Sequence, residues 1–322
     1  MWVDHCRVPA SRNESNLHGK GRLMKNRSPV FVVGFTRGGT NILMNMLLSH
    51  PDLCKPTGET AQVFKGRREE PLWRILQRRV CYDFPLRVVA GHDLFDSKNL
   101  SPRPGVSKTA ARFIDSVLHR EKVAARTTAQ NKYKFEGVEY RPEEVEQARL
   151  LAKNVNGIVF MTDALVRMYP DATFFGLMRD GRALCESHIR RGKTVQRVAR
   201  MYQRVGRAMV DYRDTYPSFH VVRFEDLIQE PMGVLDFVYT KAELPRDQIR
   251  KIRLQVKERT TVKGERRLDA EEDRQVVWYR PDELYSYFDS SVNDHQIAQL
   301  SDADREEFED RVGDVLTDLD YD

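Results

Sequence analysis

Residues 30–41 read Val-Phe-Val-Val-Gly-Phe-Thr-Arg-Gly-Gly-Thr-Asn, an apolar run that passes through a glycine-containing turn into polar residues. The run Val30–Val33 is short, rich in β-branched residues and bounded by proline and glycine, which predicts a buried strand. A turn over Phe35–Gly39 then leads into a predicted helix over Thr40–Ser49, which a His-Pro pair ends. A strand, a turn and a helix in this order are typical of an α/β fold.

The turn between this strand and this helix has the composition of an anion-binding loop. Several backbone N–H groups and the positive end of the helix dipole would point at one place there. Gly38 and Gly39 let the backbone bend, and Thr40 and Asn41 offer side-chain donors. The spacing is close to that of the triphosphate loop G-x-x-x-x-G-K-[ST], but Thr40 stands in place of the lysine. We therefore expect a phosphate-like ligand here, and a tight turn without a ligand is the alternative.

Strands alternate with helices along the rest of the chain. Buried strands are predicted at Thr173–Met178 and Phe219–Phe224, and apolar residues at three- and four-residue steps predict an amphipathic helix from Val195 to Met209. Other helices are expected at the start of Glu143–Lys153, over Met161–Met168, after Gly181, and over Leu300–Leu319. This alternation predicts one α/β domain over residues 28–322, with a central, mainly parallel sheet flanked by helices. The polar residues 1–27 are expected to form a flexible arm.

The composition of the 322 residues excludes several classes of protein. A charge of +5 with 40% hydrophobic and 31% charged residues is typical of a globular chain. The longest apolar runs fall far short of the roughly 20 residues that a membrane span needs, and no secretory signal begins the chain, so we expect a cytoplasmic protein without a membrane span. The basic stretch 179–213 lacks interleaved aromatic residues, so nucleic acid is not an expected partner. The four cysteines and eight histidines show no ligand spacing, so no metal is expected.

The loop over residues 34–41, together with His50-Pro51-Asp52, resembles the 5′-phosphosulfate loop of the sulfotransferases. This family uses 3′-phosphoadenosine 5′-phosphosulfate (PAPS) as its sulfuryl donor and has a P-loop-like α/β fold. The family pattern is G-x-x-[RK]-[ST]-G-[ST]-[ST], and this chain departs from it at Gly38 and Asn41. Both departures remove a hydroxyl group that could contact the donor.

A second motif follows the strand at Thr173–Met178. Arg179-Asp180-Gly181-Arg182, with Ser187 eight residues after Arg179, resembles the 3′-phosphate motif of the same family and is most similar to that of the tyrosylprotein sulfotransferases. A guanidinium group makes paired, charge-assisted bonds to a terminal phosphate, and a hydroxyl group adds another. The element Val222–Leu227 matches the family's strand-to-helix Y-E-D-L segment, which is structural.

The resemblance also implies which residues act. The backbone of Thr36, Arg37, Gly38, Gly39, Thr40 and Asn41 would hold the 5′-phosphosulfate, and Arg179 and Ser187 would hold the 3′-phosphate. Glu59 takes the position of the general base in tyrosylprotein sulfotransferases, and Lys153 that of a lysine in many bacterial sulfotransferases. Arg37 and Lys153 would neutralise the developing charge, with no metal. An exposed loop carboxylate and a plain surface lysine are the alternatives for Glu59 and Lys153.

Two other functions stay open at this point. One is a P-loop-type nucleotide or small-molecule kinase, and the other is an inactive nucleotide-binding relative, which Gly38 and Asn41 favour. The acceptor is not predicted: a glycan, a lipid, a small molecule or a tyrosyl-protein would each suit the resemblance. The oligomeric state is not predicted either.

Overall fold

The computed structural model describes residues 24–125, 134–135, 138–139, 141–257, 261–262, 265–266 and 274–321. Its centre is a five-stranded parallel sheet in the order β2-β5-β1-β6-β7. These strands are β1 (Val30–Gly34), β2 (Leu53–Cys54), β5 (Arg149–Val155), β6 (Thr173–Met178) and β7 (Phe219–Arg223). The prediction of a mainly parallel α/β fold is confirmed.

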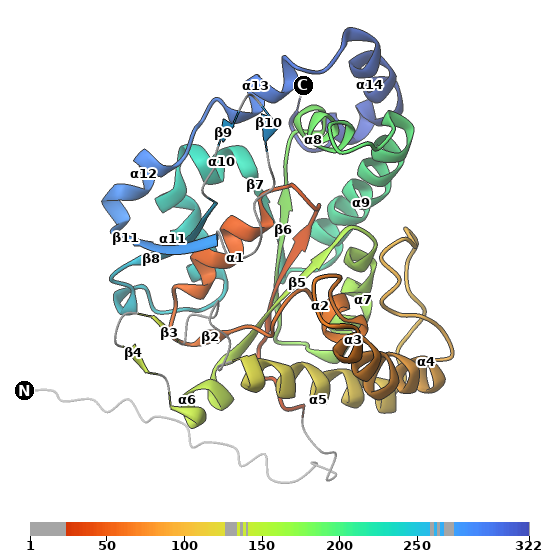
Figure 1. Cartoon of the computed structure of the whole chain (residues 1–322), viewed down its shortest axis with the longest axis vertical. Coiled ribbons are helices and arrows are strands. Elements are labelled where there is room, and N and C mark those ends of the chain that lie inside the picture. Colours follow the sequence, from red (N-terminus) through yellow and green to blue (C-terminus); the bar gives the residue numbers. More distant parts are fainter. Residues whose placement is uncertain are drawn as a thin grey trace, which may run out of the picture.

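Smaller strands and many helices surround this sheet (Figure 1). Paired short strands are β3 (Lys134–Phe135) with β4 (Val138–Glu139), β8 (Ile252–Lys257) with β11 (Arg274–Tyr279), and β9 (Thr261–Val262) with β10 (Glu265–Arg266). The helices of the first half are α1 (Thr40–Leu48), α2 (Thr60–Lys65), α3 (Leu72–Arg78), α4 (Phe84–Ala90), α5 (Lys108–Ala124), α6 (Pro142–Gln147) and α7 (Thr162–Met168). Those of the second half are α8 (Gly181–Ile189), α9 (Val195–Thr215), α10 (Phe224–Gln229), α11 (Pro231–Lys241), α12 (Leu284–Tyr287), α13 (Val292–Ile297) and α14 (Asp302–Thr317).

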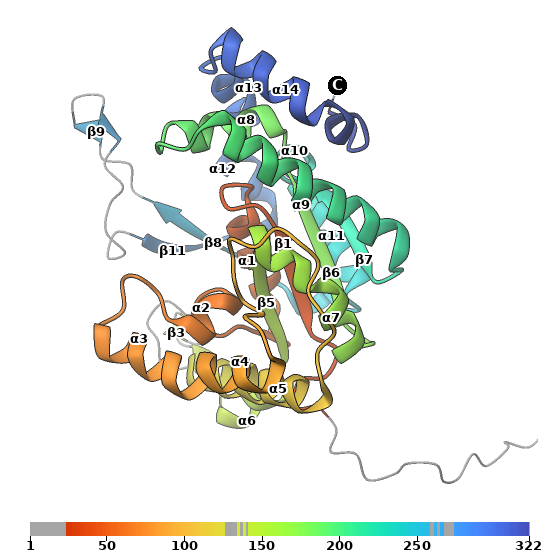
Figure 2. The ribbon, with the colours of Figure 1, turned by 90° about the vertical axis from the view of Figure 1, so that its right-hand side faces the viewer.

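Strand β1 lies in the middle of the sheet because all five of its residues are apolar or glycine and both faces are covered. Phe31 and Val33 face one hydrophobic core, to which α5, α7, α9 and α14 contribute. Val30 and Val32 face the other core, which α1, α10 and α11 build. Figure 2 shows α8, α13 and α14 grouped at one end of the molecule, at the carboxyl ends of the strands. That edge of the sheet is where the candidate site lies.

Most of the predicted elements have the expected bounds. The strand at Thr173–Met178 is β6, and the helix expected after Gly181 is α8. The apolar residues expected on one face of α9 are buried. The strand expected to end at Phe224 ends one residue earlier, because Phe224 already begins α10.

Several strands were not predicted, and β5 is the one that carries a candidate site residue. The helix expected at the start of Glu143–Lys153 is α6, but it ends at Gln147 and the remaining residues form β5. Strand β5 pairs with both β1 and β2 and carries Lys153. Lys153 and Asn154 interrupt the apolar run of this strand, whose apolar side chains face both cores.

The structure describes the last four residues of the segment expected to be an arm. The backbone amides of Lys25 and Asn26 donate to the carboxylate of Asp115 in α5, at 2.5 and 3.1 Å, and the Asn26 amide group donates to the same carboxylate at 2.8 Å. The chain is therefore attached to the domain before residue 28. The rest of the expected arm lies outside the described residues.

Candidate active site

The loop between β1 and α1 is held in a shape that needs glycine. Gly39 has a left-handed backbone with φ of 87°, and a Cβ atom there would collide with the ring of Phe224. Gly34 passes so close to β6 that a Cβ atom would lie 2.6 Å from the Leu177 carbonyl oxygen. Arg37 also has a positive φ, of 72°, and its side chain is exposed at the tip of the loop. This backbone brings the start of α1 and its N–H groups to the carboxyl edge of the sheet.

The loop is anchored by Asn156, which directly follows β5 and which sequence reasoning missed. The Asn156 side chain accepts from the Thr36 amide at 3.1 Å and donates to the Thr36 hydroxyl at 2.6 Å. The Gly38 amide donates to the Phe35 carbonyl at 3.1 Å. The amides of Thr36 and Gly38 thus already donate within the protein, and the assignment of the whole loop to the ligand stays a prediction. An anion here would meet the amides at the first turn of α1 instead.

The structure brings Glu59, Lys153 and Asn41 together beside this loop. The Lys153 ammonium group lies 2.9 Å from the Glu59 carboxylate and donates to the Asn41 side-chain oxygen at 2.7 Å. The Glu59 and Lys153 side chains are 26% and 13% exposed, so both groups are oriented yet open to solvent. Glu59 stands at the N-terminus of α2, where its backbone amide donates to the Gln62 side chain at 3.0 Å. Three residues that are far apart in sequence thus share one charged cluster.

Lys55 adds another cation near this cluster. It directly follows β2, and the register of β2 against β5 places it on the sheet face that carries Lys153. Burial, reinforced by the charges of Arg253, Lys153 and Arg67, lowers the pKa of Lys55 to about 8. Nothing in the local sequence marks this lysine, because its neighbours come from β5, β8 and the segment after α2.

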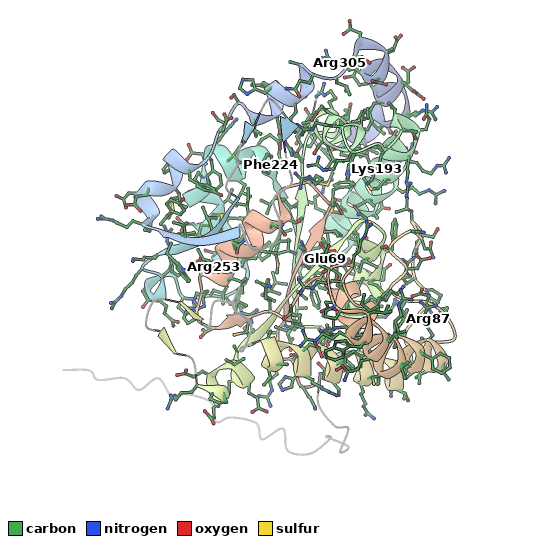
Figure 3. All side chains as sticks on the ribbon, viewed as in Figure 1. Glu69, Arg87, Lys193, Phe224, Arg253 and Arg305 are labelled. Carbon is green, nitrogen blue, oxygen red and sulfur yellow. The ribbon has the colours of Figure 1, made fainter. Side chains whose placement is uncertain are left out.

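At the other side of the loop, Arg179 is buried and well bonded. Its guanidinium group donates from Nε to Asn293 at 2.8 Å, from Nη2 to Gln296 at 2.7 Å and from Nη1 to the Arg37 carbonyl at 3.0 Å. The ring of Phe224, labelled in Figure 3, lies 4.5 Å from the guanidinium carbon. Burial lowers the pKa of Arg179, although the carboxylate of Glu225 acts in the opposite direction. Asn293 and Gln296 belong to α13, and the sequence offered no signal for either.

The segment that matches Y-E-D-L has a structural role, as expected. Glu225 accepts from the Asp180 amide at 3.1 Å and from the Tyr321 hydroxyl at 2.7 Å, and it also contacts the Asn293 side chain. Asp180 in turn pairs with Arg182 at 3.0 Å and accepts from its amide at the start of α8. These bonds join α8, α10, α13 and the end of the chain around the Arg179 motif.

Ser187 lies on α8 and is almost fully buried. Arg191 donates to its carbonyl at 2.6 Å and to its hydroxyl at 3.1 Å, and no hydrogen bond joins Ser187 to Arg179 among the residues that the structure describes. The next residue, His188, is buried against the loop. Burial and the charge of Lys193 lower its pKa to about 4, while contact with the Thr36 backbone acts in the opposite direction, so the imidazole is neutral at neutral pH.

The described part of the chain holds neither a cluster of metal ligands nor a membrane-spanning helix. No group of three or more His, Cys, Asp or Glu side chains is placed to hold a metal ion. No described helix combines the length and the apolar character that crossing a bilayer requires.

A model of the sulfotransferase family matches residues 29–248, about two thirds of the chain. The chain belongs to the sulfotransferase family. Comparison with curated protein sequences gives no match. Among solved structures, similar ones include the sulfotransferase domain of the olefin synthase from Synechococcus PCC 7002, at 18% identity and a TM-score of 0.42, covering 73% of this chain and 80% of that one. A sulfotransferase from Alicyclobacillus acidocaldarius aligns at 14% identity and a TM-score of 0.45, covering 91% of this chain and 94% of its own.

Both departures from the sulfotransferase loop pattern have a local explanation in this sulfotransferase. A Cβ atom at Gly38 would lie only 3.2 Å from the Phe35 carbonyl oxygen, so the turn favours glycine. Asn41 supplies the oxygen that accepts from Lys153, a contact that a shorter serine or threonine side chain could not make in the same way. Both residues thus take part in building the site.

Proposed function

We propose that this sulfotransferase moves the sulfuryl group from PAPS to an acceptor hydroxyl or amine by in-line transfer, with Glu59 as the general base. The observation that carries the proposal is the ion pair between Glu59 and Lys153 beside the loop between β1 and α1, which we call the glycine loop. A carboxylate at this position can take the acceptor proton, and a fixed ammonium group next to it can stabilise the developing charge. The products would be a sulfated acceptor and adenosine 3′,5′-bisphosphate.

The residues present fit the two charged ends of PAPS. The amides at the start of α1, from Gly39 through Thr40 and Asn41, would hold the 5′-phosphosulfate, and the exposed Arg37 side chain would reach its oxygens. Thr36 and Gly38 would support the loop from behind. A sulfuryl group carries less charge than a phosphoryl group in triphosphate chemistry, so Arg37 and Lys153 can act in place of a metal ion.

Arg179 is proposed to bind the 3′-phosphate. A guanidinium group has five N–H donors, and three of these are used by Asn293, Gln296 and the Arg37 carbonyl. One N–H on each terminal nitrogen is then left for a phosphate, which suits a paired contact. Ser187 would contribute its hydroxyl, oriented by Arg191.

Calorimetric titration with adenosine 3′,5′-bisphosphate in EDTA tests the donor site. We expect the wild type to bind without metal and Arg179→Ala to bind about tenfold or more weakly, a loss of about 1.4 kcal/mol. Arg311→Ala is the matched control, because Arg311 is a half-exposed arginine on α14 that pairs with Glu307 one turn earlier on the same helix. Absence of binding to the wild type would contradict the donor assignment. Labelled PAPS with a panel of hydroxyl- and amine-bearing acceptors then tests transfer.

The same protein samples also test the two alternative functions, a kinase and an inactive nucleotide-binding relative. A nucleotide kinase would bind ATP with Mg²⁺ and lose binding in EDTA, and the family match and Thr40 in the lysine position of the loop both argue against it. An inactive relative would bind the bisphosphate but transfer nothing to any acceptor. The single domain from residue 28 and the cytoplasmic location stay predictions.

A further inference from the structure

A long helical segment near the site turns apolar side chains outward. Helix α3, a π-helical turn over Arg79–Asp83 and helix α4 follow one another without a break from Leu72 to Ala90. We call its outward residues the apolar stripe: Leu72, Trp73, Leu76, Val80, Phe84 and Val88, which are 71, 61, 52, 66, 66 and 66% exposed. Side chains of this size are rarely gathered on an open surface without a binding role.

The π-helical turn keeps the stripe on one side of the segment. Steps of four residues in an α-helix of 3.6 residues per turn drift by about 40° each, so a run from Leu72 to Val88 would wind around the helix. The wider turn at Arg79–Asp83 reverses part of this drift. Turns of this kind are frequent at functional sites, and here the turn aligns the apolar residues of α4 with those of α3.

The side of the segment opposite the stripe packs against the rest of the domain. The stripe is therefore not the side with which the segment contacts the domain. Arg78 and Tyr82 both donate to Glu121 of α5, at 2.8 and 2.9 Å. Leu86 is buried in the core that α5 shares. The inner side of the segment therefore makes both polar and apolar contacts with the domain. The outer side, which carries the stripe, is exposed and can contact a partner.

The charges beside the stripe are mainly positive. Arg68, Arg74 and Arg79 are exposed. The carboxylates beside the stripe are mostly turned inward: Glu70, just before the segment, lies 3.4 Å from Arg78, and Asp83 within it pairs with Arg87 at 2.8 Å. Glu69, which is exposed, and Arg87 are labelled in Figure 3 near the two ends of the segment. An apolar stripe flanked by exposed arginines is the pattern of a helix that lies on an anionic membrane surface.

We propose that the apolar stripe docks this protein on the surface of an anionic lipid bilayer. The stripe would enter the boundary between headgroups and acyl chains, and Arg68, Arg74 and Arg79 would meet lipid phosphates. A second copy of the chain suits the stripe less well, because symmetric pairing would place arginines against arginines. The segment follows α2 in the chain and packs against it, and Glu59 is the N-cap residue of α2. Docking of this kind does not require sulfuryl transfer.

Flotation of the full chain with lipid vesicles tests the docking. We expect binding to phosphatidylcholine vesicles that contain about 30% phosphatidylglycerol, and binding about tenfold weaker to phosphatidylcholine alone or at high salt. Leu76→Glu with Phe84→Glu should reduce binding to the anionic vesicles by at least about tenfold. Phe237→Glu is the matched control, since Phe237 is a 39% exposed aromatic residue on α11, away from the stripe.

A variant that removes positive charge measures the contribution of the arginines to vesicle binding separately from that of the apolar residues. Arg74→Gln with Arg79→Gln should weaken binding to the anionic vesicles several-fold, and Arg280→Gln with Arg311→Gln, which changes two exposed arginines elsewhere, should not.

Three results would overturn the proposal. The first is a wild type that does not bind the anionic vesicles, and the second is a stripe variant that binds as the Phe237→Glu control does. The third is a wild-type dimer in sedimentation that the stripe variant converts to a monomer, because the stripe would then join two copies. Titration of the same variants with adenosine 3′,5′-bisphosphate reports on their folding. Failure of that titration in the wild type would count against the donor site and leave the docking result standing.

Discussion

The two ends of the proposed donor site are built in opposite ways. At one end, Glu59, Lys153 and Asn41 form a small cluster in which each charged group keeps an open side. At the other end, Arg179 is buried and three of its donors are bonded to protein acceptors. The open end has room for an acceptor to approach and react. The closed end resembles a protein core, which suits a group that only has to hold one phosphate in place.

The largest effect is expected at the open end. Glu59→Gln keeps the shape of the side chain but cannot accept the acceptor proton, so turnover of labelled PAPS should fall by about 10²–10⁴-fold. Affinity for adenosine 3′,5′-bisphosphate should stay near that of the wild type. Glu69→Gln, which changes an exposed carboxylate before α3, is the control. A Glu59→Gln protein with full turnover would exclude Glu59 as the base.

Acid should destabilise the folded protein through His188 of α8, which is buried against the loop between β1 and α1. Its pKa of about 4 in the folded protein lies below the value of about 6.5 expected when unfolded, so the unfolded chain binds the extra proton first. Stability should therefore fall as the pH drops from about 6.5 toward 4, by up to about 3 kcal/mol from this residue. Urea unfolding at several pH values measures this loss, and His188→Gln should make the curve flatter. Equal slopes for the two proteins would show that His188 is not responsible.

At the closed end, charge alone should not be enough. Arg179→Lys keeps a cation but loses the planar fork that Asn293, Gln296 and the Arg37 carbonyl share. We expect affinity for adenosine 3′,5′-bisphosphate to fall by about tenfold and the unfolding free energy to fall by about 1–2 kcal/mol. Titration and urea unfolding of one sample give both values. If Arg179→Lys matches the wild type in both affinity and stability, the closed end requires only a positive charge at this position and not a guanidinium group.

The smallest effect should come from the support behind Arg179. Asn293→Ala removes one acceptor of the guanidinium group and a contact with Glu225, and we expect bisphosphate binding to weaken by about fivefold. Gln299→Ala, just beyond α13, is the matched amide control. Tighter bisphosphate binding by Asn293→Ala would mean that Asn293 competes with the donor for Arg179. The closed end would then not be preformed for the phosphate.

The sequence predicts those strands whose run of apolar residues matches their burial on both faces of the sheet. The run Val30–Val33 is apolar because both faces of β1 are covered, and Thr173–Met178 is apolar for the same reason in β6. Strand β5 was missed because Lys153 and Asn154 interrupt its apolar run near the site. In the segment from Leu72 to Ala90 the sequence indicates a solvated, arginine-rich helix face over residues 65–79, but it does not predict the apolar stripe, because outward-facing apolar residues follow no core pattern.

The candidate site was predictable only in part. The glycine loop and the Arg179 motif each lie in one short segment, so a pattern of residues can reveal them. Asn156 and Lys55 act through neighbours on other strands, and Asn293 reaches Arg179 across 114 residues. Such contacts exist only once the chain has folded, and no local spacing records them.

The pairing of β5 with β1 has a consequence for the order in which the protein folds. Thr36 and Asn156, whose hydrogen bonds join the two strand ends, are separated by 120 residues of chain. The entropy lost in closing so long a loop is recovered only when both strands have paired, and domains dominated by such distant contacts fold slowly. Lys153 and the glycine loop meet across this pairing, so the chemistry of the enzyme should be among the last properties to return when the denatured chain is refolded.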